Sequence, residues 1–468
     1  MPESIHRIAL LALVAFVCLA GALGYWVASG ASLTARQDNP RRIFAEQRTL
    51  RGSILDRDGE VIVETRGEPG AYTRSTVYPD AAPVAGYYSI NYGTSGVEQA
   101  FDSTLRGTLG IDPLRATVDA LMHIPPAGRD VQVTLDLDTQ RVADALLADR
   151  TGAIVVLSVP DGEVLALSSR PTFNPNTLDE NWDRLRADPA SPLLNRATQG
   201  EYQPGTALQP IILAEALRQG IVALDEAPES PSAPFPVDLQ SLTCRASDNP
   251  SSGFPLPSVG DFAGQAVRTI EDAFRSACPA PFADLGAALG SDALSNVVST
   301  WWLTDTSMLG IGNRTPVTQA VALTDTQALR EFAVGQGRLT VSPLQMATVA
   351  STLASRGVLS PPRIISATES IDGAWQDVER VVPRRIAPAD VVRQVVSAMP
   401  HAERGGVAWH AGTGLSGRSK LHWFIGFAPV DAPRYAAAVL IEDAEGRLAS
   451  EGEAAEIGLK LLTALPHQ

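Results

Sequence analysis

The clearest chemical signal in the sequence is a pair of polar residues, Thr206 and Gln209, at the start of an apolar helical stretch. Pro204 and Gly205 predict a turn before them, and apolar residues recur at helical spacing until Gly220. Residues three apart share one helix face, so the hydroxyl and the amide should be neighbours. Acyl transfer needs a hydroxyl nucleophile and a base, but an amide has no useful basicity and the Thr methyl group crowds its hydroxyl. We expect Thr206 to bond local backbone and Gln209 to be a polar filler.

The letters around this pair resemble a penicillin-binding protein, whose usual wording here is Y-x-P-G-S-T-F-K-P with an S-x-x-K pair. The resemblance implies that Thr206 stands at the position of the catalytic Ser and Gln209 at that of the activating Lys. The frame of the motif is kept, whereas both reactive groups are replaced.

A second motif of this family, S-x-N, has its counterpart where residues 276–286 resemble the wording S-C-N-T-A-F-x-x-L-G. Ala277 takes the Ser position and Pro279 takes the Asn position. The hydroxyl of Ser276 could serve only if the register slipped by one residue. Proline offers no donor, so the resemblance implies that this position is inactive too.

The third motif, K-T-G, corresponds to residues 409–417, which align with it in two ways. Without a gap, His410 takes the Lys position, as in some relatives, and Gly412 takes the Gly position. With one deletion, Thr413 and Gly414 keep T-G, the substrate-binding part of the motif, and the lysine is lost. Lys420 follows in a segment that we interpret as a loop with solvated charges.

The residues from 51 to 64 predict a strand, an Asp-Gly turn and a second strand. Arg51, Asp56 and Arg57 also match the R-G-x-I-x-D-R-x-G motif that opens the pedestal of class B penicillin-binding proteins. Residues 86–98 look like a further element of that pedestal. The family resemblance therefore extends over nearly the whole chain.

An uncharged run from Ile8 to Gly30 is long enough to span a bilayer and ends near Tyr25 and Trp26, which suit a membrane interface. A cleaved signal peptide is the alternative. We interpret residues 8–30 as a single-pass anchor in the cell membrane, and the resemblance places the bulk of the chain outside the cytoplasm. Cys244 and Cys278 would then share an oxidising compartment, where a disulfide is permitted; the sequence leaves open whether it forms.

The length of 468 residues predicts more than one folded unit. We expect an α+β fold, with an antiparallel sheet packed between helices, in which the anchor is followed by a pedestal over residues 40–127 and a transpeptidase-like domain over residues 128–468. The net charge of −15 argues against a nucleic-acid partner, and no motif for a metal or other cofactor is present.

Several local patterns give boundaries within the large domain. Asp138 predicts the N-cap of a helix that runs to Asp149, and Ser342 predicts the N-cap of another. Ser450 with Glu453 predicts a capping box for the last helix. The proline-rich residues 227–257 favour an extended surface loop.

Concurrent loss at three motifs suggests a non-catalytic relative in cell-wall synthesis, possible partners being an active paralogue or a glycan polymerase. An active D,D-transpeptidase, which would act through Thr206 on peptidoglycan stem peptides with His410 as base, is the first alternative. A penicillin or muropeptide sensor is the second. These hypotheses share the fold and differ only in the cleft.

Overall fold

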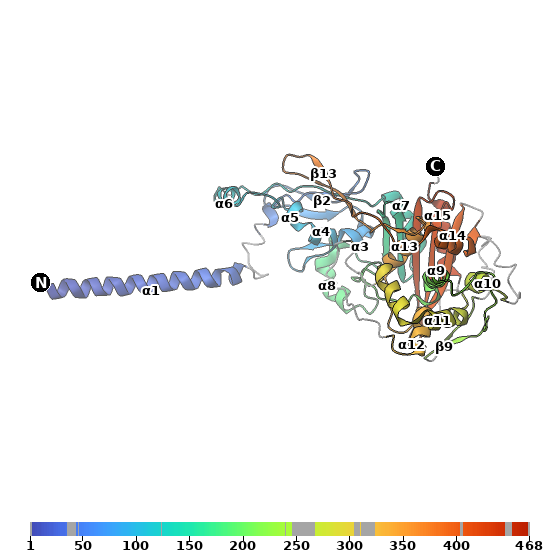
Figure 1. The fold of residues 1–468 in the computed structure, drawn as a ribbon. Helices are drawn as coiled ribbons and strands as arrows, with labels where there is room; N and C mark the ends of the chain where they lie inside the picture. Colours follow the sequence, from blue (N-terminus) through green and yellow to red (C-terminus); the bar gives the residue numbers. More distant parts are fainter. Residues whose placement is uncertain are drawn as a thin grey trace.

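The computed structural model of the chain describes residues 2–34, 44, 46–122, 124–238, 240–245, 267–303, 309, 323–402, 406–444 and 452–466. It begins with one long helix, α1 (Pro2–Thr34), which stands apart from the rest of the molecule (Figure 1). Within α1, the stretch His6–Trp26 is long and apolar enough to cross a membrane, and none of its residues is buried. This matches the uncharged run expected from the sequence.

The pedestal is built on a six-stranded sheet with the strand order β13-β12-β6-β1-β2-β3. Its strands are β1 (Ile54–Leu55), β2 (Val61–Arg66), β3 (Thr73–Thr76), β6 (Val131–Val133), β12 (Ile365–Glu369) and β13 (Trp375–Asp377). The expected domain boundary near residue 128 falls just before β6, and β12 and β13 come from much later in the chain. The pedestal is therefore assembled from segments on both sides of that boundary.

Short elements complete the pedestal around this sheet. They are η1 (Pro79–Ala81), α3 (Ala82–Ala85), β4 (Tyr88–Ser89), β5 (Gly93–Thr94), α4 (Gly96–Ala100), α5 (Asp102–Leu105) and α6 (Pro113–Leu121). Helix α6 projects from the pedestal on the side of α1, away from the large domain (Figure 1).

The large domain is organised around an antiparallel sheet with the order β15-β16-β17-β18-β7-β8. Its strands are β7 (Gly152–Ser158), β8 (Val164–Arg170), β15 (His401–Ala402), β16 (Val407–Ser416), β17 (Ser419–Ala428) and β18 (Tyr435–Asp443). Both faces are covered, so the strands are apolar on both sides. Along β7, for example, Val155 and Leu157 belong to one apolar cluster while Ile154 and Val156 belong to the other.

Helices α7 (Leu137–Leu147) and α15 (Glu453–Ala464) cover one face of this sheet. The larger cluster on the other face contains residues of α9 (Gln209–Gln219), α10 (Ile270–Arg275), α11 (Pro279–Thr300), α12 (Thr326–Ala333), α13 (Pro343–Ala354) and α14 (Ala389–Ala398). The remaining elements are η2 (Pro175–Thr177), α8 (Leu178–Ala187), η3 (Gly205–Leu208), the β9–β10 hairpin (Phe235–Val237 and Gln240–Leu242) and the β11–β14 pair (Val358–Leu359 and Arg384–Arg385). The expected α+β fold is confirmed.

Candidate functional site

The first motif forms a tight turn, η3, that delivers Thr206 to the sheet and continues into α9. Gly205 has a positive φ of 57°, and a Cβ there would lie 2.0 Å from the carbonyl oxygen of Thr413, so this close approach requires glycine. The N–H of Gly205 also donates to the carbonyl of Gly335 at 2.9 Å. Thr206 is thereby held, buried, against strand β16.

The hydroxyl of Thr206 is bonded to the backbone of β16 and not to local backbone as the sequence suggested. Its Oγ1 accepts a hydrogen bond from the N–H of Thr413 at 3.1 Å. A Cβ on Gly412 would lie 2.7 Å from the same oxygen, and one on Gly414 would lie 2.3 Å from the carbonyl oxygen of Gln203. The strand therefore lies directly over the hydroxyl. Among the residues that the structure describes, no amine is hydrogen-bonded to it.

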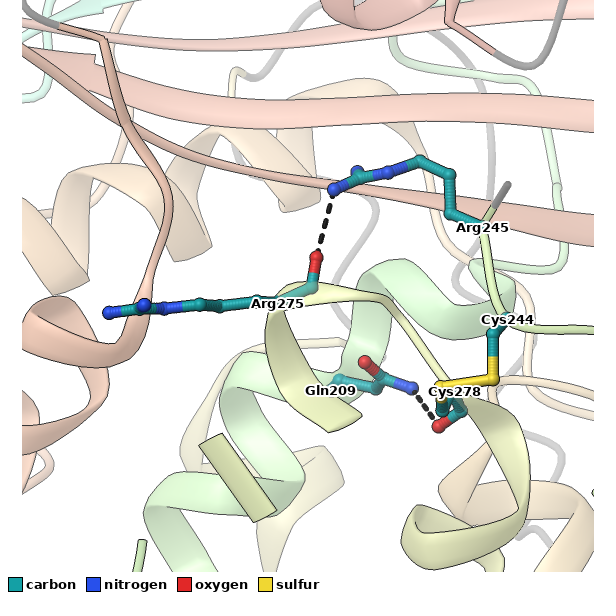
Figure 2. The surroundings of a disulfide bond; sticks show 5 residues. All are labelled: Gln209, Cys244, Arg245, Arg275 and Cys278. Carbon is teal, nitrogen blue, oxygen red and sulfur yellow. Dashed lines mark hydrogen bonds between the residues drawn. A yellow bond between two sulfur atoms is a disulfide. The ribbon is translucent and has the colours of Figure 1, made fainter. Parts of the chain in front are cut away.

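Gln209 lies at the start of α9 and is completely buried. Its Nε2 donates to the carbonyl oxygen of Cys278 at 2.8 Å, which joins α9 to the beginning of α11 (Figure 2). Its Oε1 has no hydrogen-bond partner among the described residues. The side chain thus serves as a structural tie, and it offers no group that could accept a proton from Thr206 at neutral pH.

His410 reaches the same turn from β16 but contacts its backbone. The ring Nε2 lies 3.1 Å from the carbonyl oxygen of Thr206, and the ring stacks on Phe274 with the centroids 4.6 Å apart. Burial, together with the positive charge of Arg245, lowers the pKa of His410 to about 3. The imidazole is therefore neutral near pH 7, and Nε2–H donates to the carbonyl.

The second motif supplies no hydrogen-bonding side chain at the two expected positions. Ala277 is buried and has a positive φ of 49°, and Pro279 is the first residue of α11 after the N-cap Cys278. Where the family motif has a hydroxyl and an amide, this chain has a methyl group and a proline ring.

Cys244 and Cys278 are joined by a disulfide, which connects the second motif to the segment after β10 (Figure 2). We call residues 240–245 the strap. Arg245, next to the disulfide, donates its N–H to Ser276 O at 2.8 Å and its Nη2 to Arg275 O at 2.8 Å. Its guanidinium also lies over the ring of Trp409, 5.0 Å from the centroid. The strap is thus bound to the segment before α11 by several bonds.

The strap also runs beside the edge of β16. Gln240 Nε2 donates to Gly417 O at 2.7 Å, and Arg245 Nη1 donates to Ala411 O at 3.3 Å. Leu242 packs in one apolar cluster with Leu415. The sequence predicted only a surface loop here, and that interpretation is wrong for residues 235–242, which pair as the β9–β10 hairpin.

A narrow pocket of about 50 Å³ remains between Thr206 and the strap. Arg245 and Lys420 are the cationic side chains that line it, together with hydroxyl groups of Ser241 and Thr243. Lys420 is on β17 and half-buried, so its interpretation as a solvated loop charge is wrong. The chain has two lysines, and the other, Lys460, pairs with Glu456 on α15.

Sequence reasoning missed Arg245 as a residue of the cleft. Its position directly after Cys244, in a chain where Cys278 lies within the second motif, was the signal that could have found it.

Two family models match the chain. The penicillin binding protein transpeptidase domain matches residues 152–463, and the penicillin binding protein A dimerisation domain matches residues 51–131.

Two relatives can be aligned with this chain over almost its full length. The chain is 29% identical over 488 residues to the peptidoglycan D,D-transpeptidase PbpA of Mycolicibacterium smegmatis, covering 97% of this chain and 96% of that protein. It is also 29% identical to PbpA of Mycobacterium tuberculosis, covering 99% of each. The structure of penicillin-binding protein A from M. tuberculosis as an imipenem acyl-enzyme complex has a TM-score of 0.73 at 28% identity, covering 90% of this chain and 99% of that one. The chain has a pedestal, a sheet covered on both faces, and a match to the transpeptidase family over most of its length. It therefore belongs to the penicillin-binding-protein transpeptidase family and has class B architecture.

Proposed function

We propose that this protein is a non-catalytic member of its family, which acts in peptidoglycan synthesis by binding and not by acyl transfer. The observation that carries the proposal is the hydrogen bond from the N–H of Thr413 to the hydroxyl of Thr206, while no amine of the described residues is hydrogen-bonded to that hydroxyl. A threonine hydroxyl needs a base to become a nucleophile near neutral pH. The first motif lacks one, because Gln209 is an amide.

His410 does not replace the missing base. Its pKa of about 3 leaves it almost no tendency to take up a proton near pH 7, and its Nε2 donates to the carbonyl of Thr206. The placement of His410 against Thr206, within a β16–β17 ladder that runs without a register shift, favours the alignment that has no gap. In a serine protease, loss of the nucleophile or the base alone costs on the order of 10⁶ in kcat.

The strap supports the same proposal from a different direction. Peptides commonly bind to a protein by adding a strand along a free sheet edge. Here Arg245 already occupies the carbonyl group of Ala411 on β16, and Gln240 occupies that of Gly417 in the turn directly after β16. A stem peptide could use this edge only if the strap moved away from it, and the disulfide holds the strap in place.

The proposed role is that of a single-pass membrane protein whose large domain lies outside the cytoplasm. There it would act as a scaffold or as a regulator of cell-wall synthesis proteins, such as an active paralogue or a glycan polymerase. The apolar stretch in α1 supports the anchor, and the intact pedestal supports a binding role.

A complementation experiment tests the proposal in the organism that encodes the protein. A chromosomal Thr206→Ala allele should support growth and cell shape as well as the natural gene, whereas deletion of the gene should not. If the Thr206→Ala allele behaved like the deletion, the protein would act through its hydroxyl and would be a transpeptidase.

A second measurement separates a scaffold from a sensor of penicillin or muropeptides. The cations Arg245 and Lys420 give the pocket a charge that suits an anionic ligand. Titration calorimetry of the purified protein with a muropeptide should give no heat for a scaffold. A saturable heat that Arg245→Gln removes would establish the sensor instead.

A further inference from the structure

The pedestal carries an apolar surface that its own fold leaves uncovered. Six aliphatic side chains on and around α6 are between 48% and 74% exposed, and we call them the α6 patch: Leu109, Leu114, Val118, Leu121, Met122 and Ile124. Leu114, Val118 and Leu121 recur at helical spacing, so they form one face of α6. A cluster of this kind marks a surface that is covered by something outside the domain.

The segment that bears α6 leaves the pedestal at Gly107 and returns to it at Ala127, and we call it the excursion. A Cβ on Gly107 would lie 1.7 Å from the carbonyl oxygen of Ala127, so the two ends of the excursion are in direct contact. The N–H of Gly128 donates to Leu50 O at 3.0 Å, and the N–H of Gly52 donates to Leu105 O at 2.8 Å. The excursion therefore starts beside the segment that arrives from the anchor.

The anchor limits how far this surface can be from the membrane. Nine residues lie between Thr34, the last residue of α1, and Phe44, and a fully extended chain over these ten steps spans at most about 35 Å. Leu50, whose carbonyl oxygen accepts the N–H of Gly128 at the root of the excursion, is itself an exposed apolar residue, and so is Phe44. Figure 1 shows α6 on the side of the pedestal that faces α1.

The charges of the excursion decide which force would hold it there. Asp112, Arg115 and Asp119 are its charged residues, and Arg115 pairs with Asp119 on the exposed helix surface. The segment is not basic, so attraction to anionic lipid headgroups would contribute little. Aliphatic side chains on one face of a short helix can instead enter the boundary between headgroups and acyl chains.

We propose that the α6 patch is a membrane contact, in which α6 lies in the plane of the bilayer that α1 crosses and fixes the pedestal against it. This contact is independent of whether the cleft can be acylated. It gives the pedestal a second attachment point besides the tether, so the large domain is held at a defined angle to the membrane.

The test uses the full chain in phosphatidylcholine vesicles, with brominated acyl chains as a quencher and a fluorophore on a single introduced cysteine. Cys18 is replaced by Ser so that the anchor is not labelled, and the bonded Cys244 and Cys278 are left intact. The probe is placed at Val118→Cys, and the matched control at Glu229→Cys, which is exposed on the large domain. Flotation of the vesicles shows separately that the anchor is inserted.

Brominated chains should quench the probe at position 118 by roughly twofold or more, leave the probe at position 229 unchanged, and act equally at high and low salt. Adding Leu114→Asp with Leu121→Asp should abolish the quenching at position 118 without changing the melting temperature, since both side chains are exposed. Equal signals at positions 118 and 229 in floating vesicles would overturn the contact, as would quenching that survives the two substitutions. Protein that does not float would overturn both the anchor and the contact.

Discussion

The pedestal and the cleft treat buried polar groups in opposite ways. In the pedestal, the guanidinium of Arg51 is almost fully buried and pairs with Glu98 and Asp102, each at 2.7 Å. Arg74 reaches the second oxygen of Glu98 at 2.6 Å. In the cleft, the motif positions hold only neutral side chains, and Oε1 of Gln209 and Nδ1 of His410 have no partner among the described residues.

The charged groups that stabilise the pedestal are kept in this chain, whereas the charged groups that the family motifs use for catalysis are replaced. Arg51 belongs to the motif on which the resemblance rests, and it joins α4 and α5 to the start of the pedestal sheet. Removing it would leave Glu98 paired with Arg74 alone and Asp102 paired with Arg106 alone among the described residues. The cleft keeps its shape although Gln209 and His410 stand at the positions of the motif lysines, because backbone contacts and the neutral bonds of these two side chains position η3.

The largest effect should come from breaking the pedestal network. Arg51→Met removes one partner of a buried ion pair and leaves one oxygen of Glu98 without its cation, so the free energy of unfolding should fall by about 3–5 kcal/mol. Chemical denaturation of the full chain in detergent measures it. Arg66→Met is the matched control, because its pair with Glu64 is exposed and worth about 0–1 kcal/mol. Equal losses in both variants would show that the buried network has no special weight.

The next effect concerns the strap. The disulfide closes a loop with a sequence separation of 34, and replacing Cys244 and Cys278 by Ser should cost about 3–4 kcal/mol by the chain-entropy account. Protease cleavage within residues 240–245 should also accelerate. Cys18→Ser is the control, and it should change neither measurement. A strap that remained protected in the double variant would mean that Arg245 and the β9–β10 hairpin hold it without the disulfide.

A smaller effect should appear in the pH dependence of stability. The pKa of His410 is lowered by burial to about 3 in the folded protein, so between its ordinary value and 3 the unfolded chain binds a proton that the folded chain does not. Stability therefore falls as the pH falls through this window, by about 1.4 kcal/mol per pH unit from this residue.

In His410→Gln, the free energy of unfolding should decline less steeply from about pH 6 to pH 4 than in the unmodified protein. A denaturation series in that range measures it. His401→Gln provides the comparison, since His401 is exposed on β15, and burial and the charge of Arg275 lower its pKa less than that of the fully buried His410. An unchanged slope in His410→Gln would contradict a neutral, buried imidazole.

Much of the framework could be predicted from local patterns. Ser342 caps α13 through a capping box with Gln345, as its position before Pro343 indicated. The N-cap predicted at Asp138 is wrong, because Asp136 receives the N–H of Thr139 and starts α7 two residues earlier. For the last helix, Ser450 lies outside the described residues and Gly452 is the N-cap, so the predicted capping box is not seen.

The parts that escaped prediction depend on contacts between distant segments. No local pattern shows that Thr413 would bond Thr206, that β12 would join the pedestal sheet, or that the strap would follow β16. The position of Lys420 beside the cleft depends on a strand pairing that starts only two residues after the turn at Gly417. The motif positions themselves could be predicted, because they are assigned from the order of residues along the chain and not from contacts in space.

Covalent labelling with a fluorescent penicillin tests the central claim most directly. The full chain in detergent is incubated with the reagent, denatured and compared with Thr206→Ala. We predict that both proteins give the same background fluorescence, because in the described part of the chain no amine is hydrogen-bonded to the hydroxyl of Thr206. A band that grows with time, saturates with the reagent and disappears in Thr206→Ala would contradict the account.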